Sequence, residues 1–369
     1  MSRVLLVGKG PPDRGGIPVF LATLLHSPLV AQHEVTFLNV AHHETPQGGQ
    51  LTVANLRRTA HDTLRVWRAA RRHDIVHLHS ALAPGVTVLR AALMAAAGRA
   101  AGARVVVHAH GGNIETWLSS RPRQRLVRWG LAPVDLVVAV WSTGHQVLSG
   151  VLGADKVRLI DNGVRVADFP PTTRPARVPR ILYVGLLTPR KGVLDLIEAS
   201  SLLRNRGVAH ELLLVGGTPD EGPDAEVPVR AAAEGAATLL GTRDPNEMPA
   251  TYAEADVFCL PSWWEAMPLS ILEAMASGLP VVATDVGDVS RAVVQGETGF
   301  VVGRHSPRQL ADALEPLLQD RSVRERMGWA GRARVETMFS SDVTAKAIGE
   351  VFADLRTRRP RRLMRSRRP

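Results

Sequence analysis

The sequence predicts an α/β fold made of two Rossmann-like domains, and three observations support this prediction. Short apolar runs rich in β-branched residues alternate with longer stretches of helical periodicity, as in a doubly wound parallel sheet. A proline-rich segment interrupts the alternation near the middle of the chain, after which it restarts. The length of 369 residues suits two domains, each large enough to bury its own core.

The first α/β domain is predicted over residues 1–168, and its helices include 51–72 and 86–97. Its strands are expected at 4–7, 34–38, 74–78, 104–108 and 135–140. Four prolines in 169–179 remove backbone donors, so this segment is predicted to be a linker.

The second α/β domain is predicted over residues 180–340. Its strands are expected at 180–184, 211–215, 236–240, 257–260 and 280–283. Two such domains in tandem present the carboxyl ends of their strands to a shared cleft, where ligands bind.

The formal net charge of +10 comes mainly from the carboxyl terminus. Eight arginines and no acid lie in 356–369, so the rest of the chain carries a net charge of only +2. We expect this Arg-rich tail to lack fixed structure and to contact an anionic membrane, without binding nucleic acid. A binding protein whose tail grips nucleic acid or lipid, with the α/β body as a scaffold, is an alternative.

Cysteine content and hydropathy restrict the class of protein further. Cys259 is the single cysteine, which excludes a disulfide framework and fits a reducing cytoplasm. No apolar stretch has the length of a signal peptide or a membrane span, so we expect a cytoplasmic protein, peripheral at the inner face of the membrane. The segment 117–129 mixes four arginines with two tryptophans, as an interfacial helix does, although an ordinary connecting helix explains it equally well.

Two loops carry the features of anion sites. The first strand ends in a glycine-rich loop over 8–16, and Pro18 is expected at the first position of the following helix. The glycine spacing matches neither the dinucleotide fingerprint nor the P-loop, so a simple glycine turn is an equal alternative. The second domain opens with Arg190 and Lys191 at a helix start, where two cations neutralise a pyrophosphate unless they are merely solvated.

The strongest local signal lies in 261–278, where a predicted strand runs through a loop into a helix that starts near Pro268. The first amides of this helix have no partner within it and face the predicted cleft. Glu265 precedes the helix and Glu273 lies inside it. Because carboxylates repel a pyrophosphate but accept hydrogen bonds from hydroxyls, we expect a ligand with hydroxyls on both sides of its phosphates.

These features together resemble the GT-B glycosyltransferases of family 4, which retain anomeric configuration and use nucleotide-sugar donors. The resemblance extends to about residue 340. It rests on Gly15-Gly16, His110-Gly111, Asn162-Gly163-Val164, Arg190-Lys191-Gly192, the segment 256–262, Glu265 with Glu273, and the segments 280–285 and 297–300.

The resemblance implies a fold and a role for each site residue. The two domains would face each other across a cleft, and a helix over 341–355 would cross back to the first domain. The implied contacts are Gly15 and Gly16 with the donor phosphate, Arg190 and Lys191 with the pyrophosphate, Thr242 and Arg243 with the base, Glu273 with the ribose, Glu265 with the transferred sugar, His110 near the reacting centre, and Met267, Pro268, Leu269 and Ser270 in the same donor site.

The sequence also departs from the family pattern. Arg165 follows the Asn-Gly-Val motif where the family often has Asp, and Arg291 stands where Glu is common, which reverses a charge expected near the donor. Ala266 and Met267 replace a frequent Phe-Gly pair. These changes bear on donor identity and leave both motif glutamates in place.

The resemblance predicts a hexosyltransferase that moves a sugar from a UDP- or GDP-linked donor to a glycan or lipid-linked acceptor, in cell-surface polysaccharide or glycolipid synthesis. No D-x-D sequence is present, so no metal or other cofactor is expected, and Arg190 and Lys191 would stabilise the leaving group. Two alternatives stay open. One is a sugar-nucleotide epimerase on the same fold; the other is a metal-dependent hydrolase that uses the pairs His77 with His79 and His108 with His110.

Overall fold

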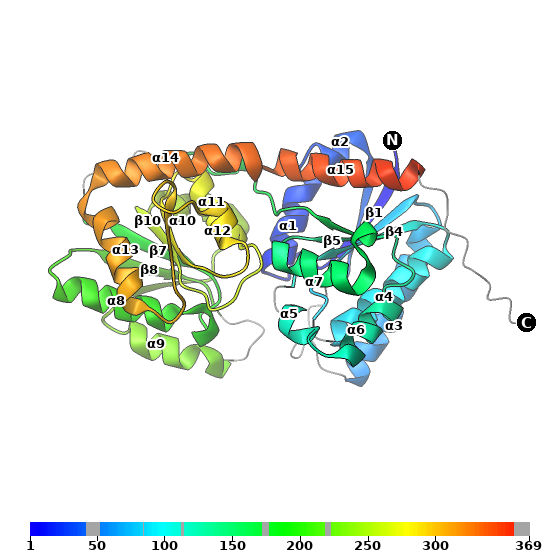
Figure 1. Cartoon of the computed structure of the whole chain (residues 1–369), viewed down its shortest axis with the longest axis horizontal. Coiled ribbons are helices and arrows are strands. Elements are labelled where there is room, and N and C mark those ends of the chain that lie inside the picture. Colours follow the sequence, from blue (N-terminus) through cyan, green and yellow to red (C-terminus); the bar gives the residue numbers. More distant parts are fainter. Residues whose placement is uncertain (42–51, 84, 112–113, 172–176, 218–222, 358–369) are drawn as a thin grey trace, which may run out of the picture.

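Two six-stranded parallel sheets, each covered by helices on both faces, form the computed structural model of the chain (Figure 1). The structure describes residues 1–41, 52–83, 85–111, 114–171, 177–217 and 223–357. The predicted α/β fold class is therefore confirmed. The tail from 358 onward, and with it most of the predicted Arg-rich segment, lies outside the described residues.

The first sheet has the strand order β2-β1-β3-β4-β5-β6. Its central strands are apolar and buried on both sides, which explains why the sequence showed them clearly. The strand β6 was not predicted, because only one of its three residues is fully buried. The strands are β1 Arg3–Gly8, β2 Glu34–Asn39, β3 Ile75–Ser80, β4 Arg104–Ala109, β5 Leu136–Ala139 and β6 Val157–Leu159.

The helices of the first half are divided between the two faces of this sheet. Buried residues of α3, α4, α6 and α7 pack against one face, and those of α1 and α2 pack against the other. Pro18 is the third residue of its helix rather than the first, because the helix already begins at Gly16. The helices are α1 Gly16–Leu25, α2 Leu29–Gln32, α3 Val53–Ala70, α4 Gly85–Ala100, α5 Ile114–Trp117, α6 Arg121–Gly130 and α7 Ser142–Leu152.

The second sheet has the strand order β12-β11-β10-β7-β8-β9. The strand β9 starts two residues later than predicted, because the amides of Ala236 and Ala237 both bond to Ala233 and prolong the preceding turn. The strand β12 was not predicted as a strand. The strands are β7 Arg180–Val184, β8 Glu211–Val215, β9 Thr238–Gly241, β10 Val257–Leu260, β11 Val281–Thr284 and β12 Gly299–Val302.

The last helix returns to the first sheet. The buried side chains of α15 include Ile348 and Phe352, which join Val4, Leu6 and Phe20 in one core cluster. Figure 1 shows α14 and α15 running along one side of both halves. The helices of the second half are α8 Val193–Asn205, α9 Val227–Ala233, α10 Met248–Ala253, α11 Leu269–Ala276, α12 Val289–Ala292, α13 Pro307–Gln319, α14 Arg321–Met338 and α15 Ser341–Thr357.

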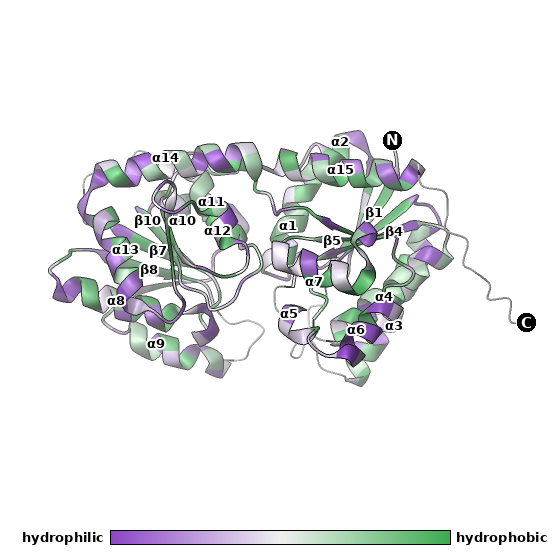
Figure 2. Cartoon of the chain, in the orientation of Figure 1, coloured by the Kyte–Doolittle hydropathy of each residue, from purple (hydrophilic) through white to green (hydrophobic). Residues whose placement is uncertain are grey.

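Hydropathy follows this layered arrangement. Figure 2 shows apolar strands in the middle of each half, with hydrophilic segments on the outer helices. Across the described residues, the helices are all too short or too polar to cross a bilayer.

Polar side chains join the two halves close to the ends of their strands. Asp288, which is 3% exposed, accepts hydrogen bonds from the amide and the hydroxyl of Ser142, at 2.8 and 2.9 Å. Arg291 donates to Asp161 at 2.9 Å and to the hydroxyl of Ser142 at 3.0 Å. The Asn162 amide donates to the carbonyl oxygen of Met267 at 2.8 Å.

Candidate active site

A cleft of about 500 Å³ lies between the two halves and is lined by residues from both. The structure brings all thirteen predicted site residues to its walls. They are Gly15, Gly16 and His110 from the first half, and Arg190, Lys191, Thr242, Arg243, Glu265, Met267, Pro268, Leu269, Ser270 and Glu273 from the second. These residues come from five separate segments, which converge because each segment follows the carboxyl end of a parallel strand.

The glycine pair of the first half lies at the start of α1. Gly15 has φ of +116°, a conformation that side-chain-bearing residues rarely adopt. A Cβ atom added at Gly15 or Gly16 would meet no other atom within 4 Å, so the space beside this helix start is open. Arg14 reaches across to Asp244 of the second half, with 3.0 Å between nitrogen and oxygen.

The two predicted cations follow β7 in a short turn over Pro189–Lys191. Gly192 ends the turn with φ of +67°, and a Cβ atom there would lie 1.9 Å from the carbonyl oxygen of Pro261. This close approach holds the turn against the loop after β10. As a result, the Lys191 ammonium lies 2.5 Å from a carboxylate oxygen of Glu265.

Glu265 is held in place from both sides. The oxygen that accepts from Lys191 also accepts a hydrogen bond from the hydroxyl of Ser262 at 2.8 Å. The carboxylate and the ammonium are both mostly buried, with 12% and 15% of their side chains exposed. The pair therefore positions one negative and one positive group at the cleft wall with little freedom to move.

The start of α11 supplies backbone donors to the same wall. Pro268 precedes the helix, and no described side chain caps this end, so the first amides have no partner within the helix. One turn further on, Glu273 accepts a hydrogen bond from the Tyr252 hydroxyl at 2.8 Å. Burial raises the pKa of Glu273. Ionisation of this carboxyl group is therefore disfavoured relative to an exposed acid, and the hydrogen bond from the neutral Tyr252 hydroxyl acts in the opposite direction by stabilising the carboxylate.

Several cleft residues were not predicted. Gly185 follows β7, and Gly216 and Gly217 follow β8. A Cβ atom at Gly216 would lie 1.7 Å from the carbonyl oxygen of Gly185, so the two neighbouring strands end in closely packed backbone. Glycine directly after two adjacent predicted strands was the available signal. The other unpredicted lining residues include Arg14, Asn162, Met248 and Trp264.

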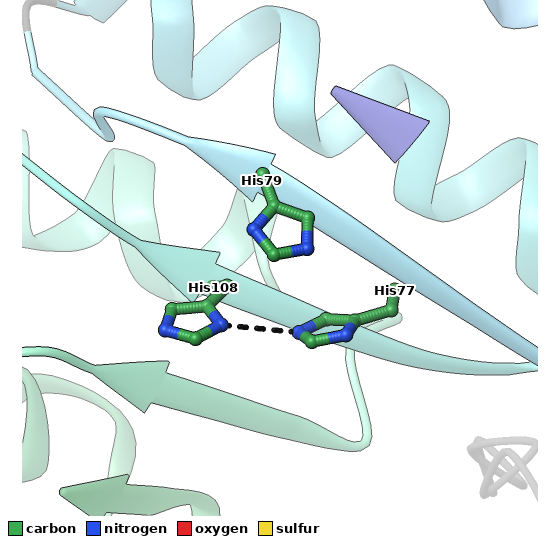
Figure 3. Close-up of side chains that lie close together, drawn as sticks. All are labelled: His77, His79 and His108. Carbon is green, nitrogen blue, oxygen red and sulfur yellow. Dashed lines mark hydrogen bonds between the residues drawn. The ribbon is translucent and has the colours of Figure 1, made fainter. Parts of the chain in front are cut away.

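The two predicted histidine pairs form a single stack on one face of the first sheet. His77 and His79 lie on β3, and His108 lies opposite His79 on β4 (Figure 3). Ring nitrogens of His77 and His108 are 3.2 Å apart, and those of His79 and His110 are 3.0 Å apart. Burial lowers the pKa of His77 and of His110 to about 3, and it lowers those of His79 and His108 too. All four rings are therefore neutral near pH 7.

Three of these histidines form a candidate metal site. One nitrogen from each of His77, His79 and His108 lies within 4.8 Å of the others, and each ring has one buried nitrogen without a hydrogen-bond partner among the described residues. Neutral imidazoles suit zinc and copper. No carboxylate belongs to the group. Metal analysis of the purified protein tests the hydrolase alternative, which stoichiometric zinc would favour.

The departures from the family pattern lie partly in the cleft lining, which includes Ala266 and Met267, and partly outside it. Arg291 was expected near the donor, but it turns toward Asp161 and Ser142 at the junction of the two halves. Arg165 forms an exposed ion pair with Asp168, at 3.3 Å. Ala266 is 9% exposed and packs with the core of the first half.

Family models match both halves of the chain. The model described as Glycosyltransferase Family 4 matches residues 13–168, and the model described as Glycosyl transferases group 1 matches residues 178–320.

Relatives with assigned activities match over different lengths. The D-inositol 3-phosphate glycosyltransferase of Corynebacterium glutamicum is 37% identical over 186 residues, which cover 49% of this chain and 44% of that protein. The chain thus spans only about half the length of this relative and of others similar to it. The GDP-mannose-dependent alpha-(1-6)-phosphatidylinositol monomannoside mannosyltransferase of Mycobacterium tuberculosis is 29% identical over 95% of this chain and 98% of its own.

Solved structures share the whole fold. Sucrose-phosphate synthase from Thermosynechococcus elongatus superposes with a TM-score of 0.77 at 22% identity, covering 96% of this chain and 99% of that one. Anabaena HepE in complex with UDP-glucose superposes with a TM-score of 0.75 at 19% identity, over 96% of this chain and 100% of its own. At these identities the neighbours establish the fold alone.

Proposed function

The chain belongs to the family 4, or group 1, glycosyltransferases of the GT-B fold, and we propose that it transfers a sugar from a UDP- or GDP-linked donor with retention of anomeric configuration. One observation carries the proposal: a single cleft holds four cations, Arg14, Arg190, Lys191 and Arg243, together with two carboxylates and an open helix start. A nucleotide sugar has the matching groups, because its diphosphate is anionic and the ribose and sugar beside it carry hydroxyls.

The proposed contacts follow from the charges of the cleft wall. Arg190, Lys191 and the first amides of α11 bind the diphosphate and stabilise the charge that develops as it leaves. Glu273 accepts from the ribose hydroxyls, and Glu265 accepts from the transferred sugar. The chain has no D-x-D sequence for a divalent cation, so we propose that these protein groups suffice without a metal.

The proposed reaction takes place on one face of the sugar. The acceptor hydroxyl attacks from the side on which the diphosphate departs, a phosphate oxygen takes the hydroxyl proton, and no protein nucleophile forms a bond to the sugar. His110 lies at the opposite wall of the cleft and is neutral; its Nε2 is bonded to His79, which leaves Nδ1 for one hydrogen bond to the ligand. A covalent glycosyl adduct trapped on Glu265 would contradict this mechanism.

Thermal-shift measurements with UDP, GDP and ADP, and with their sugars, test the donor site directly. Binding of one nucleotide raises the melting temperature and identifies the base. Lys191→Met should weaken that binding about tenfold, since it removes one charge-assisted contact to the diphosphate. Lys346→Met, an exposed change on α15, is the matched control. Failure of every nucleotide to bind would contradict the proposal.

The acceptor is proposed to be a glycan or a lipid-linked glycan, in cell-surface polysaccharide or glycolipid synthesis. Support comes from the relative that matches over nearly its full length, whose name specifies a phosphatidylinositol mannoside acceptor. We propose a cytoplasmic location, peripheral to the membrane. Strict dependence of donor turnover on an added acceptor distinguishes transfer from the epimerase alternative, which needs none.

A further inference from the structure

The helices α3, α4 and α6 expose an unusual amount of apolar surface. They contribute eight of the fifteen large hydrophobic residues that are exposed in the described part of the chain. The eight are Val53, Leu56, Leu64, Trp67, Leu89, Leu93, Leu126 and Trp129. Exposed apolar side chains scattered singly are ordinary, but a concentration on neighbouring helices indicates an interaction surface.

On α3 the exposed apolar residues form a stripe. Val53, Leu56, Leu64 and Trp67 recur with helical spacing, so they share one side of the helix. The buried residues Asp62, Val66 and Ala70 lie about 120° around the helix from this stripe and face the sheet. The helix α3 therefore has two apolar surfaces. One is buried in the core, and the other is the stripe exposed to solvent.

The stripe continues onto α4 and α6. The helix α4 packs against both α3 and α6, and it exposes Leu89 and Leu93 one turn apart. On α6, Leu126 and Trp129 are exposed, and Trp129 is 73% accessible. Figure 1 shows α3, α4 and α6 together on the outer side of the first half, and Figure 2 shows green and purple segments interleaved along them.

Arginines surround this surface. Residues 52–130 contain thirteen arginines and three acids, so their net charge is +10. Excess acids elsewhere offset this charge, because residues 1–355 together carry only +2. Each acid already has a partner: Asp62 is buried with Arg65 and Arg90, Asp74 pairs with Arg3, and Glu115 accepts from Trp141. The exposed arginines are Arg57, Arg68, Arg71, Arg72, Arg121, Arg123, Arg125 and Arg128.

We propose that this basic apolar face, formed by the exposed residues of α3, α4 and α6, docks on an anionic lipid bilayer. Apolar side chains enter the boundary between headgroups and acyl chains while arginines contact lipid phosphates. A second copy of the chain is a poor occupant, because it would bring eight arginines against eight others. Nucleic acid would meet the arginines but would leave the apolar stripe uncovered.

Vesicle binding of the full-length protein tests the proposal. One set of vesicles contains equal amounts of phosphatidylglycerol and phosphatidylcholine, and the other contains phosphatidylcholine alone. The test variant combines Leu64→Ser, Trp67→Ser and Trp129→Ser. The matched control combines Val227→Ser, Trp329→Ser and Met338→Ser, which are similarly exposed but belong to the second half. Both are made again in a full-length chain whose tail arginines after position 357 are replaced by serine.

We expect the wild-type face to bind the anionic vesicles with or without the tail arginines. The test variant should lose about tenfold or more in partition coefficient, because three apolar side chains no longer reach the acyl boundary. The control should change less than about twofold. Unchanged melting temperature and nucleotide binding show that both variants are folded.

Three results would overturn the proposal. The first is equal binding by the test variant and the control. The second is loss of all vesicle binding when only the tail arginines are replaced. The third is a different occupant, shown by a wild-type dimer that the test variant dissociates, or by duplex DNA or RNA that binds at salt concentrations where vesicles do not.

Discussion

The two walls of the cleft differ in how they are built. The wall from the second half is charged and internally paired, with Lys191 on Glu265 and Tyr252 on Glu273. The wall from the first half contributes Gly15, Gly16 and a neutral His110, backed by three more neutral histidines, and a single cation, Arg14, whose partner Asp244 belongs to the second half. One half thus carries most of the charge that an anionic donor needs, and the other provides shape and neutral hydrogen-bonding groups.

This difference has a physical cause. Buried charges are stable only when they are paired, and the mostly buried Lys191 has its counterion, Glu265, in the same half. Neutral imidazoles need no counterions, and the first half buries four of them in a stack without an acid among them. The comparison between a paired wall and a neutral wall is open to four tests.

The largest expected effect is on the charged wall. Glu265→Gln keeps the size of the side chain and an oxygen that accepts from Ser262, but it removes the negative charge. We expect the rate of sugar transfer to fall about a hundredfold or more, and the melting temperature to fall as well, because the mostly buried Lys191 loses its counterion. Glu325→Gln, on the exposed surface of α14, is the control. Full activity of Glu265→Gln would mean that charge at this position is unimportant.

The next effect concerns the contact between Asp288 and Ser142, which joins the two halves. Asp288→Ala leaves the Ser142 amide and the Arg291 guanidinium without their shared acceptor in a nearly closed environment. We expect a loss of about 2 kcal/mol in the free energy of unfolding. Urea unfolding measures it, with Asp312→Ala as an exposed control. A loss equal to that of the control would show that the halves do not depend on this contact.

The neutral wall predicts a pH dependence. The pKa of His77 and of His110 is about 3 in the folded protein, against an ordinary histidine pKa of 6.5, so the unfolded chain binds more protons between these values. Stability should therefore be complete above pH 6.5 and fall on acidification, by about 1.4 kcal/mol per pH unit for each such histidine.

Urea unfolding at several pH values between about 7.5 and 5, with a chelator present, measures this slope. His77→Leu should make the slope shallower by the share of one histidine. His61→Gln, at an exposed position on α3, is the matched control. An identical slope in His77→Leu and wild type would contradict the neutral stack.

The smallest effect is expected outside both walls. Arg165→Asp restores the residue that the family often has, and it removes only an exposed ion pair with Asp168. We expect less than about 0.5 kcal/mol in stability and less than about a twofold change in nucleotide affinity. A larger change in affinity would place residue 165 in the donor site after all.

Sequence patterns predicted the buried central strands most clearly, although the edge strand β2 was also predicted without a fully buried residue. Central strands such as β1 and β10 are continuous apolar runs, whereas β6 and β12 at the edges bury only part of their residues and gave no clear signal. In β9 the apolar run began in a turn, so the predicted start was two residues early.

Site residues were predictable where the signal lay within one short segment of sequence. Contacts between residues far apart in the sequence were not predictable. Loops at strand ends identified the residues that now line one cleft. The pairing of Lys191 with Glu265 joins residues 74 apart, and that of Arg291 with Asp161 joins residues 130 apart. Spacing in one sequence does not reveal such partners, so the contacts of Arg291 at the junction of the two halves were not predicted.

The position of α15 has a consequence for synthesis on the ribosome. The face of the first sheet that holds Val4, Leu6 and Phe20 is completed by Ile348 and Phe352, near the end of the chain. The amino-terminal half emerges first but keeps an apolar face uncovered until the second half has been made. The core of the first half is therefore completed only after α15 has been synthesised. A nascent chain stalled before residue 341 would expose that apolar face to chaperones.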